Sequence, residues 1–252
     1  MHKIRNRFRI IRMLQKTRGI ALKVTNYSEN SVVAQIFTEH LGLQSYLING
    51  ARKPKAKIHV NMLQPLHLLD MVVYVKESNS LQRIKEAQQT PPLQQIPLDI
   101  VKSSVAIFLN EVLYKTLKQQ QAEPQLFHFI QQSILWLDQT EGTVQNFHLS
   151  FLMKLSRFLG FLPTTTPEIK PYFDLVEGIF SHHAPAHTYV LQQPHTAIFH
   201  QILSENYDNA QHISMKKEDR KYLLEQIINF YKLHSENFGT VNSIKILEEI
   251  FN

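Results

Sequence analysis

A short basic stretch is the part of this sequence best suited to contact a polyanion. Residues 50–57 (GARKPKAK) carry four cationic side chains between two segments that are typical of strands. The four are Arg52, Lys53, Lys55 and Lys57. Lys and Arg neutralise phosphates, and Gly50 and Pro54 favour a loop over regular structure. The stretch therefore indicates nucleic-acid contact, with an ordinary solvated charge cluster as the alternative.

The charge of the whole chain is divided unevenly. It has 252 residues, with 27 Lys and Arg against 21 Asp and Glu, a net charge of +6. Residues 1–90 hold 15 Lys and Arg against 5 Asp and Glu (+10), whereas residues 91–252 hold 12 against 16 (−4). Such asymmetry indicates a polyanionic partner for the first part, either nucleic acid or an anionic membrane.

Residues 1–12 form a basic extension without the apolar core of a secretory signal. The extension either orders on nucleic acid or precedes the native start at Met13, and we favour the second interpretation because the patterned sequence begins just after Met13. No window of about 18 residues is free of charge and apolar, so we expect no transmembrane helix.

Several classes of chemistry lack their usual residues. With no Cys, the chain cannot form a disulfide, a thiol nucleophile or a Cys-based zinc site. Its seven Gly make no phosphate-binding loop, and there is no G-x-S-x-G, D-x-D or H-E-x-x-H pattern. We therefore expect no catalytic residues and no cofactor. The alternative is a metal-dependent nuclease, or another nucleic-acid enzyme, that uses dispersed carboxylates.

Thirteen His are the one hint of a metal. His183 and His187 are four residues apart, and His195 and His200 are five apart, which are spacings that neutral imidazoles use to bind zinc. Sites made only of His are uncommon, so we interpret these residues as loop and surface histidines and predict no metal site.

Residues 13–90 are patterned as five short strands, which predicts a small antiparallel barrel. The strands are expected at 19–24, 32–38, 44–48, 66–76 and 81–87. Four aromatic residues of this part could stack on bases, although a place in the barrel core is the favoured alternative for each of them taken alone. They are Tyr27, Phe37, Tyr46 and Tyr74.

The pattern changes after residue 90. A Pro- and Gln-rich connector at 88–98 precedes apolar residues at helical spacing, as in Val101, Val105 and Phe108. Residues 91–252 are therefore expected to be helical, with an irregular, His- and Pro-rich insert at about 164–195 in which a short hairpin could form around Phe173–Val190. The fold class is α+β, a β-barrel followed by an all-α helical domain.

Ordered motifs in the first part resemble a known family. They are Thr17-Arg18-Gly19-Ile20, Phe37-Thr38 with Gly42, Gly50-Ala51-Arg52, and Leu63-Gln64-Pro65 followed by Leu69. In this order and spacing they resemble the N-terminal half of RecO, a bacterial recombination mediator family of DNA repair. The stretch FHLSFLMKLSRFLGFLP continues the resemblance, which extends more weakly to the C-terminus.

The resemblance implies an N-terminal OB-fold and a protein that binds single- and double-stranded DNA and anneals complementary strands without catalysis. It implies partnership with RecR and with the acidic C-terminal tail of single-strand binding protein (SSB), and indirectly with RecA, which is loaded onto SSB-coated DNA. It implies a cytoplasmic, nucleoid-associated location, with no membrane. It adds Arg18, Lys23, Arg83 and Lys85 to the basic loop as DNA-contact residues.

The helical part raises two further questions, which are the site of the acidic SSB tail and the fold of the insert. An acidic tail with apolar end groups requires an apolar cleft rimmed by cations. The candidate cations of the helical part are Lys115, Lys118, Lys154, Arg157, Lys216, Lys217, Arg220 and Lys221. Of these, Lys154 and Arg157 lie near apolar helix positions and are our prediction for that site, with ordinary surface charges as the alternative. Many members of the family carry a four-cysteine zinc module that would fall at about 164–200, where this chain has no Cys. The local fold of that segment is therefore open.

Overall fold

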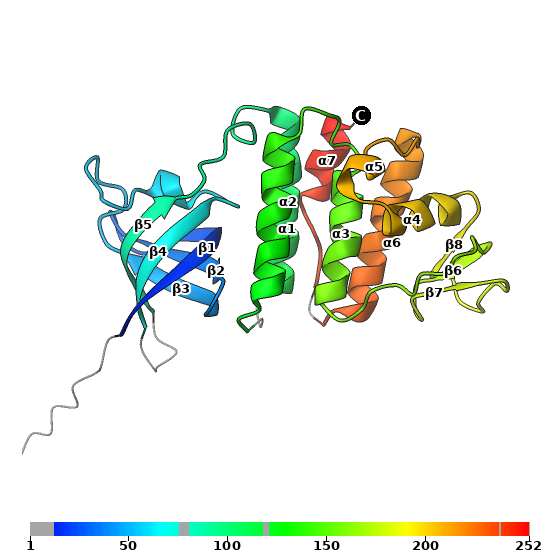
Figure 1. The fold of residues 1–252 in the computed structure, drawn as a ribbon, viewed down its shortest axis with the longest axis horizontal. Helices are drawn as coiled ribbons and strands as arrows, with labels where there is room; N and C mark the ends of the chain where they lie inside the picture. The colour runs from blue at the N-terminus through cyan, green and yellow to red at the C-terminus, as the bar shows by residue number, and fades with distance from the viewer. Residues whose placement is uncertain (1–12, 76–80, 118–120, 237, 252) are drawn as a thin grey trace, which may run out of the picture. The chain divides into compact units, whose positions relative to one another are not determined.

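The computed structural model describes residues 13–75, 81–117, 121–236 and 238–251 (Figure 1). The basic extension of residues 1–12 lies outside the described residues. The chain divides into two compact units, residues 1–92 with 119–128 and residues 93–118 with 129–252. We describe each unit on its own.

The first unit contains five strands. They are β1 (Met13–Asn26), β2 (Val32–Thr38), β3 (Gly42–Ile48), β4 (Leu68–Val75) and β5 (Arg83–Gln89). The sheet order is β3-β2-β1-β4-β5, and all neighbours are antiparallel. A parallel bridge between Tyr46 and Gln82 joins β3 to the start of β5, with Gln82 N donating to the Ser45 carbonyl at 2.9 Å. The predicted five-stranded, OB-like barrel is confirmed.

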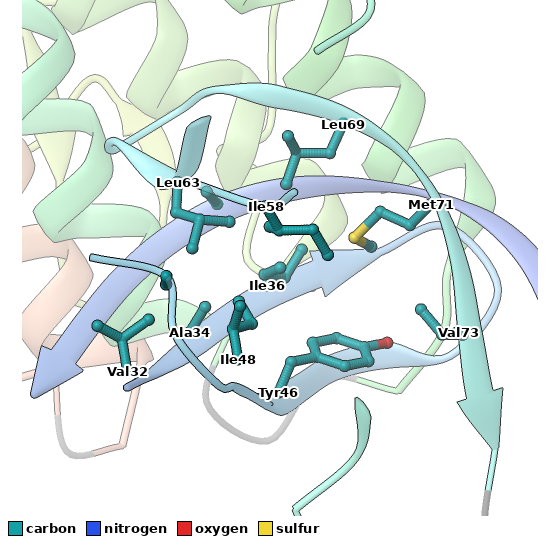
Figure 2. Close-up of a cluster of buried hydrophobic side chains, with 12 residues drawn as sticks. Val32, Ala34, Ile36, Tyr46, Ile48, Ile58, Leu63, Leu69, Met71 and Val73 are labelled. Carbon is teal, nitrogen blue, oxygen red and sulfur yellow. The ribbon is translucent and has the colours of Figure 1, made fainter. Parts of the chain in front are cut away.

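Alternate side chains of the strands fill the barrel (Figure 2). Ile36, Tyr46 and Met71 are among the residues of this buried cluster, and Leu63 of the short helix η1 (Val60–Leu63) also belongs to it. Gly19 on β1 allows the closest packing. A Cβ there would lie 2.5 Å from Met71 Cε and 2.6 Å from Ile36 Cγ2, so a larger residue would force the core apart.

The second unit is mainly helical (Figure 1). Its helices, of which α2 begins in the first unit, are α1 (Ile100–Thr116), α2 (Pro124–Gln139), α3 (Phe147–Phe158), α4 (His195–Ser204), α5 (Tyr207–Ala210), α6 (Lys217–His234) and α7 (Ile244–Ile250). The connector is anchored where it enters this unit. Buried Asp138 accepts hydrogen bonds from the backbone N–H groups of Gln94, Gln95 and Ile96 at 2.8–3.1 Å. These bonds satisfy a buried carboxylate that would otherwise be costly.

The insert carries more regular structure than the single short hairpin considered from the sequence, and its β6-β7 hairpin lies in the expected region. It forms a three-stranded sheet in the order β7-β6-β8, made of β6 (Tyr172–Asp174), β7 (Ile179–Ser181) and β8 (Val190–Gln192). Phe173 packs on Phe180 and Phe199 with ring centroids 4.8 and 4.7 Å apart. Aromatic packing therefore holds the three short strands.

No helix in the described part of the chain has the length and apolar character needed to cross a membrane.

Candidate nucleic-acid interface

The basic loop between β3 and η1 has a buried frame and exposed charges. Ala51 is fully buried and Ile58 is 9% exposed, which fixes both sides of the loop in the barrel core. Gly50 has a φ of +70°, a conformation that favours glycine. The cations between these anchors are all exposed. They are Arg52, Lys53, Lys55 and Lys57.

Hydrogen bonds tie this loop to the turn between β1 and β2. Arg52 N donates to the Asn30 carbonyl at 3.3 Å, and the Arg52 guanidinium donates to the Asn26 side-chain oxygen. Both partners are neutral, so Arg52 keeps its charge for a ligand. Among the described residues, no acidic side chain forms an ion pair with any of the four loop cations.

Beside the loop, β1, β2 and β3 present a solvent face without acidic side chains. Lys23 lies opposite Gln35, which lies opposite Ser45. In the next row Thr25 lies opposite Val33, which pairs with Leu47. Strand 2, strand 3 and the adjoining loops are the surface with which OB-folds bind oligonucleotides. We name the outer surface of β1, β2 and β3, together with the loop of residues 50–57, the basic face.

One hollow of the barrel differs from the basic face in charge. It has a volume of about 540 Å³ and is lined by residues of β1, β4 and β5, including Lys16, Asp70 and Glu86, together with Glu39. Its three carboxylates outnumber its two cations, Lys16 and Arg18, so it attracts phosphate groups less than the basic face does. We name it the acidic groove.

Arg18, a predicted DNA contact, lines the acidic groove and is neutralised within it. Its Nε and Nη2 donate to the two Glu39 carboxylate oxygens at 2.8 and 2.7 Å. This bidentate hydrogen bond lowers the pKa of Glu39. Glu39 therefore stays ionised and offsets the charge that Arg18 would offer to a phosphate.

The remaining predicted DNA contacts lie on strands. Lys23 is exposed on β1, and Arg83 and Lys85 are exposed on β5. Lys85 Nζ lies 3.3 Å from the Glu86 carboxylate. The structure thus groups the four loop cations and puts the strand cations at separate positions.

The four aromatic candidates have different exposures. Phe37 and Tyr46 are fully buried in the barrel, so the prediction that they could stack on bases is wrong. Tyr74 is partly buried on β4. Tyr27 is 61% exposed and directly follows β1, next to the turn that holds the basic loop.

Lys154 and Arg157, the predicted contacts of an acidic tail, lie on α3. Lys154 Nζ donates to the Glu205 carbonyl at 2.6 Å and lies 5.6 Å from the centre of the Tyr207 ring. Burial lowers the pKa of Lys154. Arg157 is exposed on the last turn of the helix. Lys154 therefore has a structural role in the helical unit.

Lys217 and Arg220, two of the other cations considered for an acidic tail, lie in a cleft formed by α3, α6 and α7. Its lining also includes His148, Leu224 and Phe251, and the ion pair of Lys221 with Glu248. The cleft encloses about 30 Å³, and Phe251 also lines a neighbouring groove of about 320 Å³. We name it the Arg220 cleft.

Arg220 is 9% exposed and has neutral hydrogen-bond partners. Its Nε donates to Asn146 Oδ1 and its Nη2 to Gln145 Oε1, both at 3.1 Å. Burial lowers the pKa of Arg220, and within the described residues no carboxylate forms an ion pair with it. A largely buried guanidinium that is not paired with a carboxylate attracts an anionic group strongly.

His148 completes the wall of this cleft. Its ring meets Phe108 edge-on at 6.0 Å and stacks on Phe251 at 5.6 Å. Its Nδ1 is buried and without a hydrogen-bond partner in the described part of the chain. Burial lowers the pKa of His148 to about 3. The cleft thus combines an apolar wall with a cation, a combination that only the folded chain brings together.

The histidine-rich segment does not bring its imidazoles together. His187 Nε2 lies 3.2 Å from the Asp174 carboxylate, and His195 Nε2 lies 3.0 Å from that of Asp219. Within the described residues, no group of three or more His, Asp and Glu side chains is arranged to hold a metal ion.

An OB-like barrel with an acid-free face and a basic loop defines a nucleic-acid-binding class of protein. The family model described as Recombination protein O N terminal matches residues 13–92. The model described as Recombination protein O C terminal matches residues 97–241. The chain therefore belongs to the RecO family of DNA repair proteins.

Curated bacterial relatives agree over almost their full length. The DNA repair protein RecO of Azobacteroides pseudotrichonymphae is 37% identical over 241 residues, which cover 95% of this chain and 100% of the relative. That of Bacteroides fragilis is 36% identical over 242 residues, with 95% and 100% covered. The protein of Flavobacterium psychrophilum is 30% identical over 239 residues, with 94% and 99% covered.

Proposed function

We propose that this protein is a recombination mediator without catalytic turnover. It binds single- and double-stranded DNA through the basic face and anneals complementary strands. The observation that carries this proposal is the concentration of four exposed cations in one loop, beside a solvent face of the barrel that carries no acidic side chain. Contacts of this kind engage the phosphate backbone and therefore accept any sequence.

RecR, SSB and RecA are the partners that complete this function. With RecR, the protein helps to load RecA onto SSB-coated single strands in the cytoplasm. Family membership supports this part of the proposal.

The acidic SSB tail fits the Arg220 cleft in chemistry. An acidic peptide with an apolar end offers a carboxylate to Arg220 and a side chain to the Phe251 ring, and Lys217 is exposed at the rim. Lys154 and Arg157 stay an alternative prediction, of which Arg157 supplies an exposed cation on α3.

The test of the DNA-binding function uses the intact chain. Binding of a labelled single strand is measured by anisotropy over a range of salt concentrations, together with the annealing rate of two complementary strands. If each of the four loop cations contacts one phosphate, log K against log salt has a slope of roughly −3, at about −0.7 per phosphate. The absence of both binding and faster annealing at low salt would refute the proposal.

The non-catalytic part of the proposal needs its own assay. Labelled single- and double-stranded DNA is incubated with the protein in Mg²⁺, Mn²⁺ or Zn²⁺. We expect the DNA to remain intact. Cleavage that increases in proportion to the protein would instead favour the metal-dependent nuclease.

A further inference from the structure

We propose that Tyr27 is a base-stacking residue that gives the basic face a preference for single strands. This inference rests on the proposed DNA binding and assigns a second kind of contact to the same surface. Loop cations bind the phosphates of either form of DNA, whereas stacking requires a base whose aromatic face is open. Such faces are free in a single strand and are covered in a duplex.

The charges of the barrel decide which surface a strand follows. In the acidic groove, three carboxylates outnumber the two cations. The solvent face of β1, β2 and β3 carries Lys23 and neutral residues in its paired rows. A phosphate backbone is therefore favoured along the basic face, which leads to the loop of residues 50–57.

Tyr27 stands where this face meets the loop. On β1, Lys23 and Thr25 are exposed on either side of the half-buried Val24, and Tyr27 lies two residues beyond Thr25 in a stretch that is exposed throughout. The ring is 61% exposed. A ring of this size that is left in water at the end of a strand adds little to the core, but it offers an aromatic face to a ligand.

The backbone around Tyr27 is held in place. Tyr27 N donates to the Ser31 carbonyl at 2.9 Å, and Ser28 N donates to the same oxygen at 3.2 Å. The neighbouring Asn26 and Asn30 accept hydrogen bonds from Arg52 of the basic loop. The aromatic ring and the loop cations are therefore fixed to one rim of the barrel, so a single strand can be stacked and neutralised together.

The experiment compares three variants of the intact protein on a single strand and on a duplex of equal length. Tyr27→Ala removes the ring, and Tyr27→Phe keeps it without the hydroxyl. Tyr189→Ala removes a similarly exposed tyrosine, 44% exposed, from the helical unit. Binding is measured by anisotropy at one salt concentration, and folding of both units is checked by thermal unfolding followed by circular dichroism.

We expect Tyr27→Ala to weaken single-strand binding about 10-fold, as for loss of one stacked base, and duplex binding less than about 2-fold. Tyr27→Phe and Tyr189→Ala should bind both forms like the wild type. If Tyr27→Ala binds the single strand like the wild type, or weakens both forms equally, the stacking role is refuted while the proposed DNA binding stands. If the wild type itself binds no DNA, both proposals are refuted.

Discussion

The basic loop of residues 50–57 and the Arg220 cleft both present cations, but in opposite physical states. The loop cations are exposed, and three of the four are lysines. Arg220 is 9% exposed and is oriented by two neutral side chains at 3.1 Å. The loop is thus a solvated cluster of point charges, whereas the cleft is a single pre-oriented guanidinium beside an apolar wall.

This difference suits the two sites to the two kinds of anion that we propose for them. Hydrated lysines neutralise phosphates wherever these lie along a strand and carry no sequence information, so they suit a long polyanion. A fixed, partly desolvated guanidinium favours one carboxylate in one geometry. The comparison predicts that the two sites can be disabled separately and that they respond differently to substitution, pH and salt.

Charge reversal in the loop should have the largest effect. Lys53→Glu with Lys55→Glu removes two phosphate contacts and introduces repulsion, so we expect single-strand affinity at low salt to fall by on the order of 100-fold. The salt slope should become shallower by about 1.4. The control is Lys232→Glu with Lys245→Glu, the same charge change at exposed positions of the helical unit. An equal loss of single-strand affinity in the control would mean that the net charge of the protein, and not the position of the loop cations, determines DNA binding.

The pH dependence of stability tests whether the His148 imidazole in the cleft is excluded from water. Because the folded pKa of His148 is about 3 and its ordinary value is 6.5, the unfolded chain takes up the proton first on acidification. Stability is therefore lost as the pH falls from about 6.5 towards 3, by about 2 kcal/mol at pH 5. His148→Phe removes this titration.

The measurement for His148 is urea unfolding of both proteins at pH 7 and pH 5. Each protein is compared with itself, so any packing cost of the new ring cancels. The pH 7-to-5 decrease should be about 2 kcal/mol smaller in the variant. Equal decreases would mean that the imidazole is hydrated in the folded state.

Substitution of Arg220 tests the geometry of the cleft. Arg220→Lys keeps the charge but loses the planar donor pair, so affinity for an acidic SSB-tail peptide should fall about 10-fold by calorimetry. A C-terminally amidated form of the peptide, which lacks the terminal carboxylate, should bind the wild type about 10-fold more weakly than the unmodified peptide does. Arg157→Glu is the comparison on α3: if it abolishes binding while Arg220→Lys does not, the tail binds at α3 instead.

The smallest effect is expected at a cation that already has a counter-charge. Arg18→Gln should change single-strand affinity by less than about 3-fold, because Glu39 offsets the charge of Arg18 in the native protein. The single-strand affinity of this variant is measured by anisotropy titration at the low salt concentration used for the loop variant. A loss as large as that of the loop variant would place Arg18 in the DNA contact.

The sequence predicted the barrel well because its signals are local. Strand alternation, turns and the spacing of Arg18-Gly19 and Gly50 lie within short windows. The basic loop is equally local, since its four cations fall within six residues. Burial was harder to predict, because Tyr27 and Tyr46 belong to the same pattern of aromatics, and only the closed barrel makes one exposed and the other buried.

The Arg220 cleft could not be predicted in this way. Arg220 was one of several cations considered for an acidic tail, but Asn146, Arg220 and Phe251 come from separate segments, so the sequence does not show that they meet. Of the sheet of β6, β7 and β8, only a short hairpin was expected. Its strands have three residues each, too few for a periodic signal, and the Phe173 cluster that holds them is assembled only by tertiary packing.

The most direct test of two independent anion sites is a paired binding measurement. Single-stranded DNA and the acidic tail peptide are each titrated into the wild type, the Lys53→Glu/Lys55→Glu variant and the Arg220→Lys variant. We predict that the loop variant loses DNA and keeps the peptide, and that the Arg220 variant loses peptide and keeps DNA. If either variant binds both ligands more weakly to the same degree, or if the loop variant binds DNA like the wild type, the claim of two independent anion sites is contradicted.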